Sequence, residues 1–282
     1  MIGRRGAMML GLTAMLGVRG QATAPADWRW GVDYGAATDP VLARACRVLV
    51  LEPDHARPIA PLRGAGGILL GYVSFGEVER QRPYVAALDA AGALLAPNPH
   101  WPDARMADLR HPAWRAAVVD TIVPAILAQG FDGIFIDTLD NAEAMETRDP
   151  ATMKGMVAAG AALIAAVRAR FPGIRIMLNR GYAALPQAAR RIDYVLGEAM
   201  ASRWNFATKR YDLLSDDDWR WQATRLRAAR AANPALELMT LDYWDPADTR
   251  QVAALYARER AAGFRPYVST LALDRLIAEP RA

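Results

Sequence analysis

The sequence predicts a single-domain (β/α)8 barrel, in which eight parallel strands alternate with helices. The chain has 282 residues, 53% of them hydrophobic, which is long enough for one large domain with a sizeable core. Apolar β-type runs alternate with alanine-rich helical stretches, as is typical of βαβ units around a parallel sheet. Eight such units over about 250 residues match this barrel in number and size.

The first 24 residues have the order of a secretory signal peptide. Arg4 and Arg5 precede an apolar segment from Ala7 to Val18, and small residues follow as far as Ala24. The apolar segment is too short to stay in a bilayer as a stable anchor. The paired arginines fit twin-arginine export. We therefore expect a secreted or periplasmic protein whose residues 25–282 form the barrel.

The predicted strands and helices follow one another in eight pairs. The strands are Trp28–Tyr34, Arg47–Glu52, Gly67–Phe75, Gly133–Asp137, Ile174–Asn179, Tyr194–Glu198, Leu236–Tyr243 and Arg265–Thr270. The helices are Pro40–Cys46, Ile59–Arg63, Pro83–Ala90, Pro112–Gln129, Thr152–Arg170, Ala183–Arg190, Asp216–Ala232 and Ala247–Ala262. Pro124 should kink or split the fourth helix. The segment from Ala91 to His111 is too long for a plain connector, and we expect it to fold over the barrel mouth.

Composition excludes several kinds of partner. The formal charge is +4, but the basic residues are spread along the chain without a Lys/Arg run, so no nucleic-acid surface is expected. Cys46 is the only cysteine, so no intramolecular disulfide can form. We expect a monomer that relies on its hydrophobic core.

The stretch Gly130–Asn141 is the clearest candidate for a functional strand end. An apolar run from Ile134 to Ile136 leads directly into Asp137, Asp140 and Asn141. A strand buried on both faces cannot keep an unpaired carboxylate inside, so Asp137 should lie at the strand mouth. The alternative is a strand followed by an ordinary turn built from Asp140 and Asn141.

Polar and aromatic side chains collect at the predicted strand ends. In this fold the C-terminal ends of the strands face one pocket, so these residues should converge. We expect the following to bind substrate: Asp33, Tyr34, Glu52, Tyr72, Ser74, Glu77, Asp140, Asn141, Asn179, Asp242, Tyr243 and Tyr267. For the tyrosines, plain core or rim packing is the alternative. Glu77 and Glu79 would crowd one face and raise one pKa, or else pair with Arg80 or Arg82.

Residue types exclude several chemistries. Both lysines, Lys154 and Lys209, lie away from strand ends, which argues against a Schiff base. His55, His100 and His111 are scattered through loops, which argues against a zinc site. There is also no glycine-rich turn from a strand into a helix of the kind that binds nucleotides. We therefore expect no cofactor and no metal.

Carboxylate chemistry remains, and glycoside hydrolysis needs two carboxyl groups at one bond. Asp137 and Glu198 close the fourth and sixth predicted strands, and alternate strands contribute to the same layer of side chains in a barrel. Retaining enzymes hold their carboxyls about 5–5.5 Å apart and inverting ones about 6.5–9.5 Å apart. The sequence does not choose between these ranges.

At these residues the sequence resembles glycoside hydrolase family 114, the endo-α-1,4-polygalactosaminidase-like proteins. The resemblance lies in the segments from Gly71 to Glu79 with Arg82, from Trp101 to Arg110, from Gly130 to Asn141, at Leu178-Asn179 and at Glu198. It implies a (β/α)8 barrel without a metal cofactor that hydrolyses an extracellular polymer of α-1,4-linked galactosamine. It also implies that Asp137 is the nucleophile and Glu198 the acid/base, which are the roles found in a retaining enzyme.

The substrate class has a physical argument as well. Galactosamine units carry ammonium groups at neutral pH, and a cleft lined by Asp33, Glu52, Glu77, Asp140 and Asp242 would attract them. Two other functions are compatible with the same residues. One is a non-catalytic barrel that binds carbohydrate. The other is a barrel enzyme of another reaction type, such as an isomerase or lyase, that uses the carboxylates as acid and base.

Overall fold

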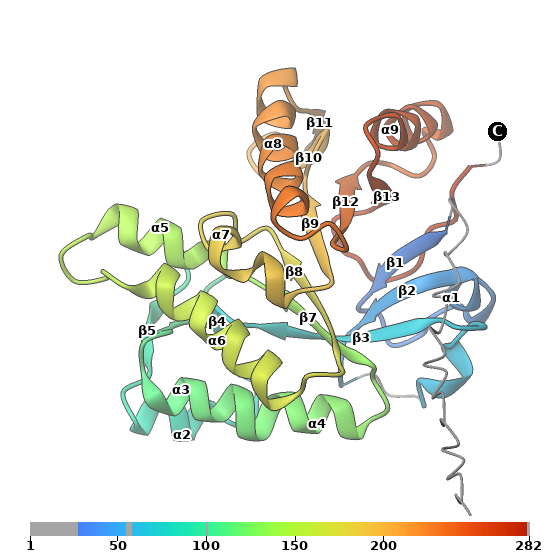
Figure 1. Cartoon of the computed structure of the whole chain (residues 1–282). Helices are drawn as coiled ribbons and strands as arrows, with labels where there is room; N and C mark the ends of the chain where they lie inside the picture. The colour runs from blue at the N-terminus through green and yellow to red at the C-terminus, as the bar shows by residue number, and fades with distance from the viewer. Residues whose placement is uncertain (1–27, 55–57, 100, 281–282) are drawn as a thin grey trace, which may run out of the picture.

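Eight parallel strands form the central sheet of the computed structural model, which describes residues 28–54, 58–99 and 101–280 (Figure 1). Their order is β1-β2-β3-β7-β8-β9-β12-β13, and each strand pairs in parallel with its neighbours. They span Arg29–Asp33, Cys46–Leu51, Ile68–Ser74, Gly133–Asp137, Arg175–Asn179, Tyr194–Glu198, Glu237–Tyr243 and Arg265–Ser269. All eight predicted strands are therefore present, and the expected barrel is confirmed. The predicted signal peptide lies outside the described residues.

Helices cover the outside of the strand layer (Figure 1). They are α1 (Pro40–Ala45), α2 (Val85–Ala90), α3 (Pro112–Ala116), α4 (Val123–Ala128), α5 (Asp140–Arg148), α6 (Met156–Arg170), α7 (Leu185–Ala188), α8 (Asp216–Ala232) and α9 (Thr249–Ala261), with 3-10 turns at Ala60–Leu62 and Ala189–Arg191. The apolar side chains of strands and helices pack into one main core, which includes the fully buried Phe75, Trp114 and Ile134. Within the described residues, no helix is long and apolar enough to cross a membrane.

Pro124 interrupts the predicted fourth helix. A wider π turn over Ala117–Ile122 separates α3 from α4, and Pro124 stands in the first turn of α4. Proline has no N–H to donate and its ring crowds the carbonyl four residues earlier, so a regular α-helix cannot continue through it. The expected split of this helix is confirmed.

Two small antiparallel sheets and one helix were not predicted. The segment between α2 and α3 forms β5 (Leu94–Pro97) and β6 (Ala104–Ala107), which join β4 (Glu77–Glu79) in an antiparallel sheet. A second antiparallel pair, β10 (Ser202–Asn205) with β11 (Arg210–Leu213), follows β9. Helix α5 gave no clear helical signal, because it is short and polar, buries only Ala142 and Met145, and has no side-chain cap.

The barrel is nearly closed. Strands β1 and β13 lie side by side, but no backbone ladder joins them within the described residues; Trp30 Nε1 donates to the Arg265 carbonyl instead. The C-terminal segment covers this seam, where Tyr34 N donates to Leu273 O and Ile277 N to Tyr267 Oη. The seam is therefore closed by side chains and by the end of the chain.

Candidate active site

Three neighbouring strands end in the same way. β7, β8 and β9 end at Asp137, Asn179 and Glu198, and the next residues have φ values of 60°, 50° and 52°. These residues are Thr138, Arg180 and Ala199. A left-handed backbone costs a residue with a side chain about 1–3 kcal/mol, so the surroundings must hold it.

Hydrogen bonds supply that support. The Thr138 hydroxyl lies 2.6 Å from Ser74 Oγ and accepts from Gly76 N at 2.9 Å. A Cβ on Gly76 would lie 2.1 Å from the Thr138 carbonyl oxygen, so only glycine allows this approach. The left-handed turns aim the three strand-end side chains at one point.

Asn179 joins the two carboxyl groups predicted to be catalytic. Its Nδ2 donates to Asp137 Oδ1 at 2.9 Å and to Glu198 Oε2 at 2.5 Å. The two oxygens can be no farther apart than these two bonds laid end to end. This limit applies to the two bridged oxygens, and it is compatible with the spacing of about 5–5.5 Å between the carboxyls of retaining glycosidases. No ion pair among the described residues involves either carboxyl.

One carboxyl of the acid pair has a raised pKa. Burial, with the negative charge of Glu198 second, raises the pKa of Asp137 to about 7, although hydrogen bonds from Asn179 and from Thr138 N oppose the shift. Both side chains are half-buried and open onto a cleft. Two close carboxyls that share one proton can supply an acid and a base together.

Three tyrosines surround the pair. Tyr243 Oη donates to Glu198 Oε1, and Tyr34 packs edge-on against Tyr72 at 5.1 Å between ring centroids. Burial raises the pKa of each hydroxyl well above 10, with the charges of nearby carboxylates as a further cause. The phenols therefore stay neutral and act as donors or packing surfaces.

The acid pair opens into a cleft of about 640 Å³. Its described lining carries six carboxyl groups and one guanidinium: Glu77, Glu79, Asp103, Asp137, Asp140, Glu198 and Arg180. Arg180 lies 3.5 Å from Asp140, so its charge is partly compensated. The cleft of a net basic protein is therefore strongly acidic.

Half of the residues predicted to bind substrate line this cleft. They are Tyr72, Glu77, Asp140, Asn141, Asn179 and Tyr243. Glu77 Oε2 accepts from Asn98 Nδ2 at 2.5 Å and from Asn141 Nδ2 at 3.4 Å. Burial raises the pKa of Glu77. The charge of Glu79 also raises this pKa, as the sequence suggested. Glu79 itself forms an ion pair with Arg82 at 2.8 Å, which is the other predicted possibility.

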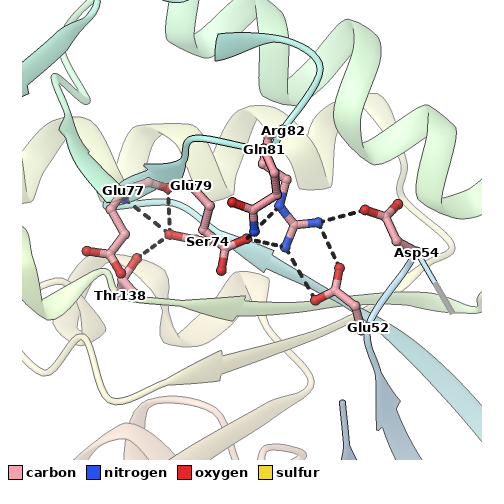
Figure 2. Close-up of polar contacts among 8 residues, drawn as sticks. All are labelled: Glu52, Asp54, Ser74, Glu77, Glu79, Gln81, Arg82 and Thr138. Atoms are coloured by element: carbon pink, nitrogen blue, oxygen red, sulfur yellow. Dashed lines mark hydrogen bonds and ion pairs between the residues drawn. The ribbon is translucent and has the colours of Figure 1, made fainter. Parts of the chain in front are cut away.

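Glu52 belongs to an ion-pair cluster and does not line the cleft. Figure 2 shows Arg82 between Glu52, Asp54 and Glu79, with the Arg82–Glu52 pair at 2.7 Å. Arg82 therefore ties the end of β2 to β4 beside the cleft. The Ser74 hydroxyl is also bonded within the protein: it donates to the Glu77 carbonyl and forms a hydrogen bond with the Thr138 hydroxyl (Figure 2). Glu52 and Ser74 therefore do not line the cleft, and their bonds within the protein fit a supporting role.

Three further predictions were wrong because the side chains point elsewhere. Asp33 is fully buried below the C-terminal segment and caps Gly35 N. Tyr267 packs against Trp30 in the seam between β13 and β1. Asp242 points to the opposite face of β12 from Tyr243, because successive strand residues alternate, and it binds Ala201 N and Ser202 N. Tyr34 lies beside the acid pair, below the cleft lining.

The sequence analysis assigned no role to several lining residues. Among them, Asn98, Trp101 and Asp103 come from the turn between β5 and β6, and Arg180 follows β8. The first three lie within the segment 91–111, which was expected to fold over the barrel mouth, but no single residue of it was predicted to line the cleft. Among the described residues, no cluster of three or more His, Cys, Asp or Glu side chains could hold a metal ion. His111 Nδ1 accepts from Ala113 N at the start of α3.

Comparison with known proteins gives consistent results. The sequence profile of glycoside-hydrolase family GH114 matches residues 13–281. An uncharacterized protein of Deinococcus radiodurans is 31% identical over 270 residues, which is 88% of this chain and 82% of that protein. The glycoside hydrolase domain of PelA from Pseudomonas aeruginosa superposes with a TM-score of 0.76 at 30% identity, covering 89% of this chain and 98% of that domain. Ega3 from Aspergillus fumigatus, solved in complex with galactosamine, shares the fold with a TM-score of 0.65 at 14% identity, covering 92% of this chain and 98% of that one.

Proposed function

Because the chain belongs to glycoside hydrolase family GH114, we propose that it cleaves an α-1,4-linked galactosamine-containing exopolysaccharide by a retaining mechanism. The observation that carries this proposal is the bridge from Asn179 to both carboxyl groups. It holds the two carboxyls close together, which supports a mechanism with a covalent glycosyl intermediate.

Asp137 would act as the nucleophile and Glu198 as the acid/base. Glu198 gives its proton to the leaving glycosidic oxygen while an Asp137 oxygen attacks the anomeric carbon and the C–O bond breaks. In the second half, Glu198 takes a proton from water, whose oxygen then displaces Asp137. Asn179 and Tyr243 orient the two carboxyls throughout.

The raised pKa of Asp137 supports a cationic substrate. Burial raises the pKa of Asp137, although this residue must be an anion to attack. An ammonium group bound in the acidic cleft would lower that pKa and favour the anion. Binding of an amino sugar would thus ionise the nucleophile, whereas an N-acetylated sugar would not.

The galactosamine in the Ega3 complex points to the same sugar class. The acidic cleft also supports it. Glu77 and Asp140 line it as predicted, and Glu79 and Asp103 take the place of Asp33, Glu52 and Asp242. These charges would attract a polycation despite the net charge of +4.

The test is incubation of the purified protein with α-1,4-galactosamine polymers of graded N-acetylation. We expect reducing oligomers from the de-N-acetylated polymer, with α products seen first by NMR. Equal rates on fully acetylated polymer would contradict the role of the ammonium group. First products of β configuration would contradict retention, and binding without any new reducing ends would indicate a carbohydrate-binding barrel instead.

We further propose that the protein acts outside the cytoplasm, where such a polymer accumulates. The predicted signal peptide, Met1 to Ala24, supports this proposal. Cell fractionation of the full-length protein and of a variant with Arg4 and Arg5 replaced by Lys tests both export and the twin-arginine route.

A further inference from the structure

Large aromatic side chains that remain exposed are unusual in the described part of this chain. They are Trp101, Phe206 and Trp221, which are 56%, 64% and 45% exposed. A single exposed apolar side chain is common, but two that gather at one site indicate contact with something else.

Trp101 and Phe206 do gather at one site. Trp101 stands in the turn between β5 and β6, and Phe206 in the turn between β10 and β11. Their rings meet edge to face at 6.1 Å between centroids, although the residues are far apart in sequence. Both turns belong to small antiparallel sheets outside the eight-stranded sheet. The contact therefore joins two segments that lie outside the barrel strands.

The aromatic pair is continuous with the catalytic cleft. Trp101 lines the same cleft as Asp137 and Glu198. The hairpin that carries Phe206 also contacts the cleft wall. Its Tyr211 Oη accepts a hydrogen bond from the backbone N of Leu271, another lining residue. A chain leaving the acid pair along this wall therefore passes the two rings.

We propose that Trp101 and Phe206 bind a sugar unit of the polysaccharide beyond the units at the cleavage point. The C–H face of a pyranose ring is apolar and packs on aromatic rings, and an ammonium substituent adds attraction to the ring face. This inference rests on the proposed function, because its ligand is the same amino-sugar polymer. It adds a contact that only chains long enough to span both places can make.

The effect of losing the pair should therefore depend on chain length. A short oligomer that fills only the units beside Asp137 and Glu198 does not reach the rings, so its binding should not change. A long polymer gains the extra contact through an already bound chain, which makes the second contact effectively intramolecular.

The experiment measures Kd for de-N-acetylated α-1,4-galactosamine polymer and for the trimer. All variants carry Glu198→Gln, so that the ligand is not cleaved. The double variant Trp101→Ala, Phe206→Ala is compared with Trp221→Ala. Trp221 is a matched control, because it is also an exposed aromatic, but it contacts Tyr182 and Arg225 away from the cleft.

We expect the double variant to raise Kd for the polymer roughly tenfold, which corresponds to about 1.4 kcal/mol, and to leave the trimer unchanged. Trp221→Ala should change neither. Trp101→Phe with Phe206→Tyr should restore polymer binding, which separates the loss of aromatic faces from a local unfolding of the loops.

Two results overturn the inference while leaving the proposed function intact. In the first, the protein with the native Glu198 cleaves the polymer, but the double variant shows an unchanged Kd for it. The other is an equal loss of affinity in the Trp221 control. A protein that binds the polymer through these rings but never produces reducing ends would instead retain the inference and refute hydrolysis.

Discussion

Two pairs of acids lie on opposite sides of the strand layer. Asp137 and Glu198 face the barrel mouth, whereas Asp242 and Glu259 lie between β12 and helix α9. Burial is the main cause of a raised pKa in both places: to about 7 for Asp137, about 6 for Asp242 and about 8 for Glu259. Titration behaviour alone therefore does not distinguish them.

The two pairs differ in whether a substrate can reach them and in what their carboxyl oxygens bind. The outer pair lines no part of the cleft, and its bonds go to the protein itself: Asp242 accepts from Ala201 N and Ser202 N at 2.7 Å, and Glu259 from Trp219 Nε1 at 2.7 Å. The inner pair keeps open space beside it. A raised pKa marks a chemical site only where a substrate can reach the group.

The largest difference between the two pairs is expected in catalysis. Asp137→Asn or Glu198→Gln should lower kcat at least about a thousandfold, because each removes a group that touches the reacting bond. Glu259→Gln should change kcat by no more than about twofold. Release of reducing ends from the polymer measures both, and a comparable loss in the Glu259 variant would contradict the comparison.

The second difference concerns stability. Asp242→Ala leaves the buried N–H groups of Ala201 and Ser202 unpaired and should lower the free energy of unfolding by about 2–4 kcal/mol. Asp242→Asn is the matched control, because its amide oxygen can still accept both bonds. Urea denaturation measures the difference, and equal losses in the two variants would show that the charge matters more than the bonds.

The third difference concerns Asn179, which donates hydrogen bonds to both carboxyls of the inner pair. Asn179→Ala removes a hydrogen bond from each carboxyl, and kcat should fall roughly 10- to 100-fold. Since that bond lowers the pKa of Asp137, the acid limb of the pH–rate profile should move to higher pH. Asn141→Ala, which loses only a contact to Glu77, should leave the limb in place.

The smallest effect is the pH dependence of stability from Glu259. Its pKa of about 8 in the folded protein lies above the usual value of 4.5, so the folded state binds the extra proton between these values. The stabilisation is complete below about pH 4.5 and is lost as the pH rises through about 8. Glu259→Gln should flatten this slope and raise Tm at pH 8 by a few degrees, as thermal scans at several pH values would show. A slope that persists in the variant would assign the proton to another group.

The barrel could be predicted because its signals are local and repeated. Each strand reads as an apolar run, as in Ile134–Ile136, and each long helix as an alanine-rich stretch such as α6. The added elements gave no such signal. Strands β10 and β11 are short and largely exposed, so tertiary contacts and not their own pattern hold them in place.

The candidate site could be predicted only in part. Every strand end was a candidate, and Asp137, Asn179 and Glu198 do meet at one point. Asp242 does not, because a shift of one residue along a strand turns a side chain to the other face. Tyr267 does not, because it packs against Trp30 in the seam. The burial of Asp33 depends on the C-terminal segment, which packs onto β1 from the far end of the sequence.

The amino-acid order alone was enough to predict the eight-strand barrel, the family resemblance and two strand-end acids as candidates, since these depend on the periodicity and types of neighbouring residues. The spacing of the two carboxyls depends on the folded chain. It is set by the left-handed turns at Thr138, Arg180 and Ala199 and by the Asn179 bridge. None of these three residues favours such a backbone by itself, so only bonds to neighbouring strands, such as Arg180 N to Leu196 O and Ala199 N to Leu241 O, hold them there.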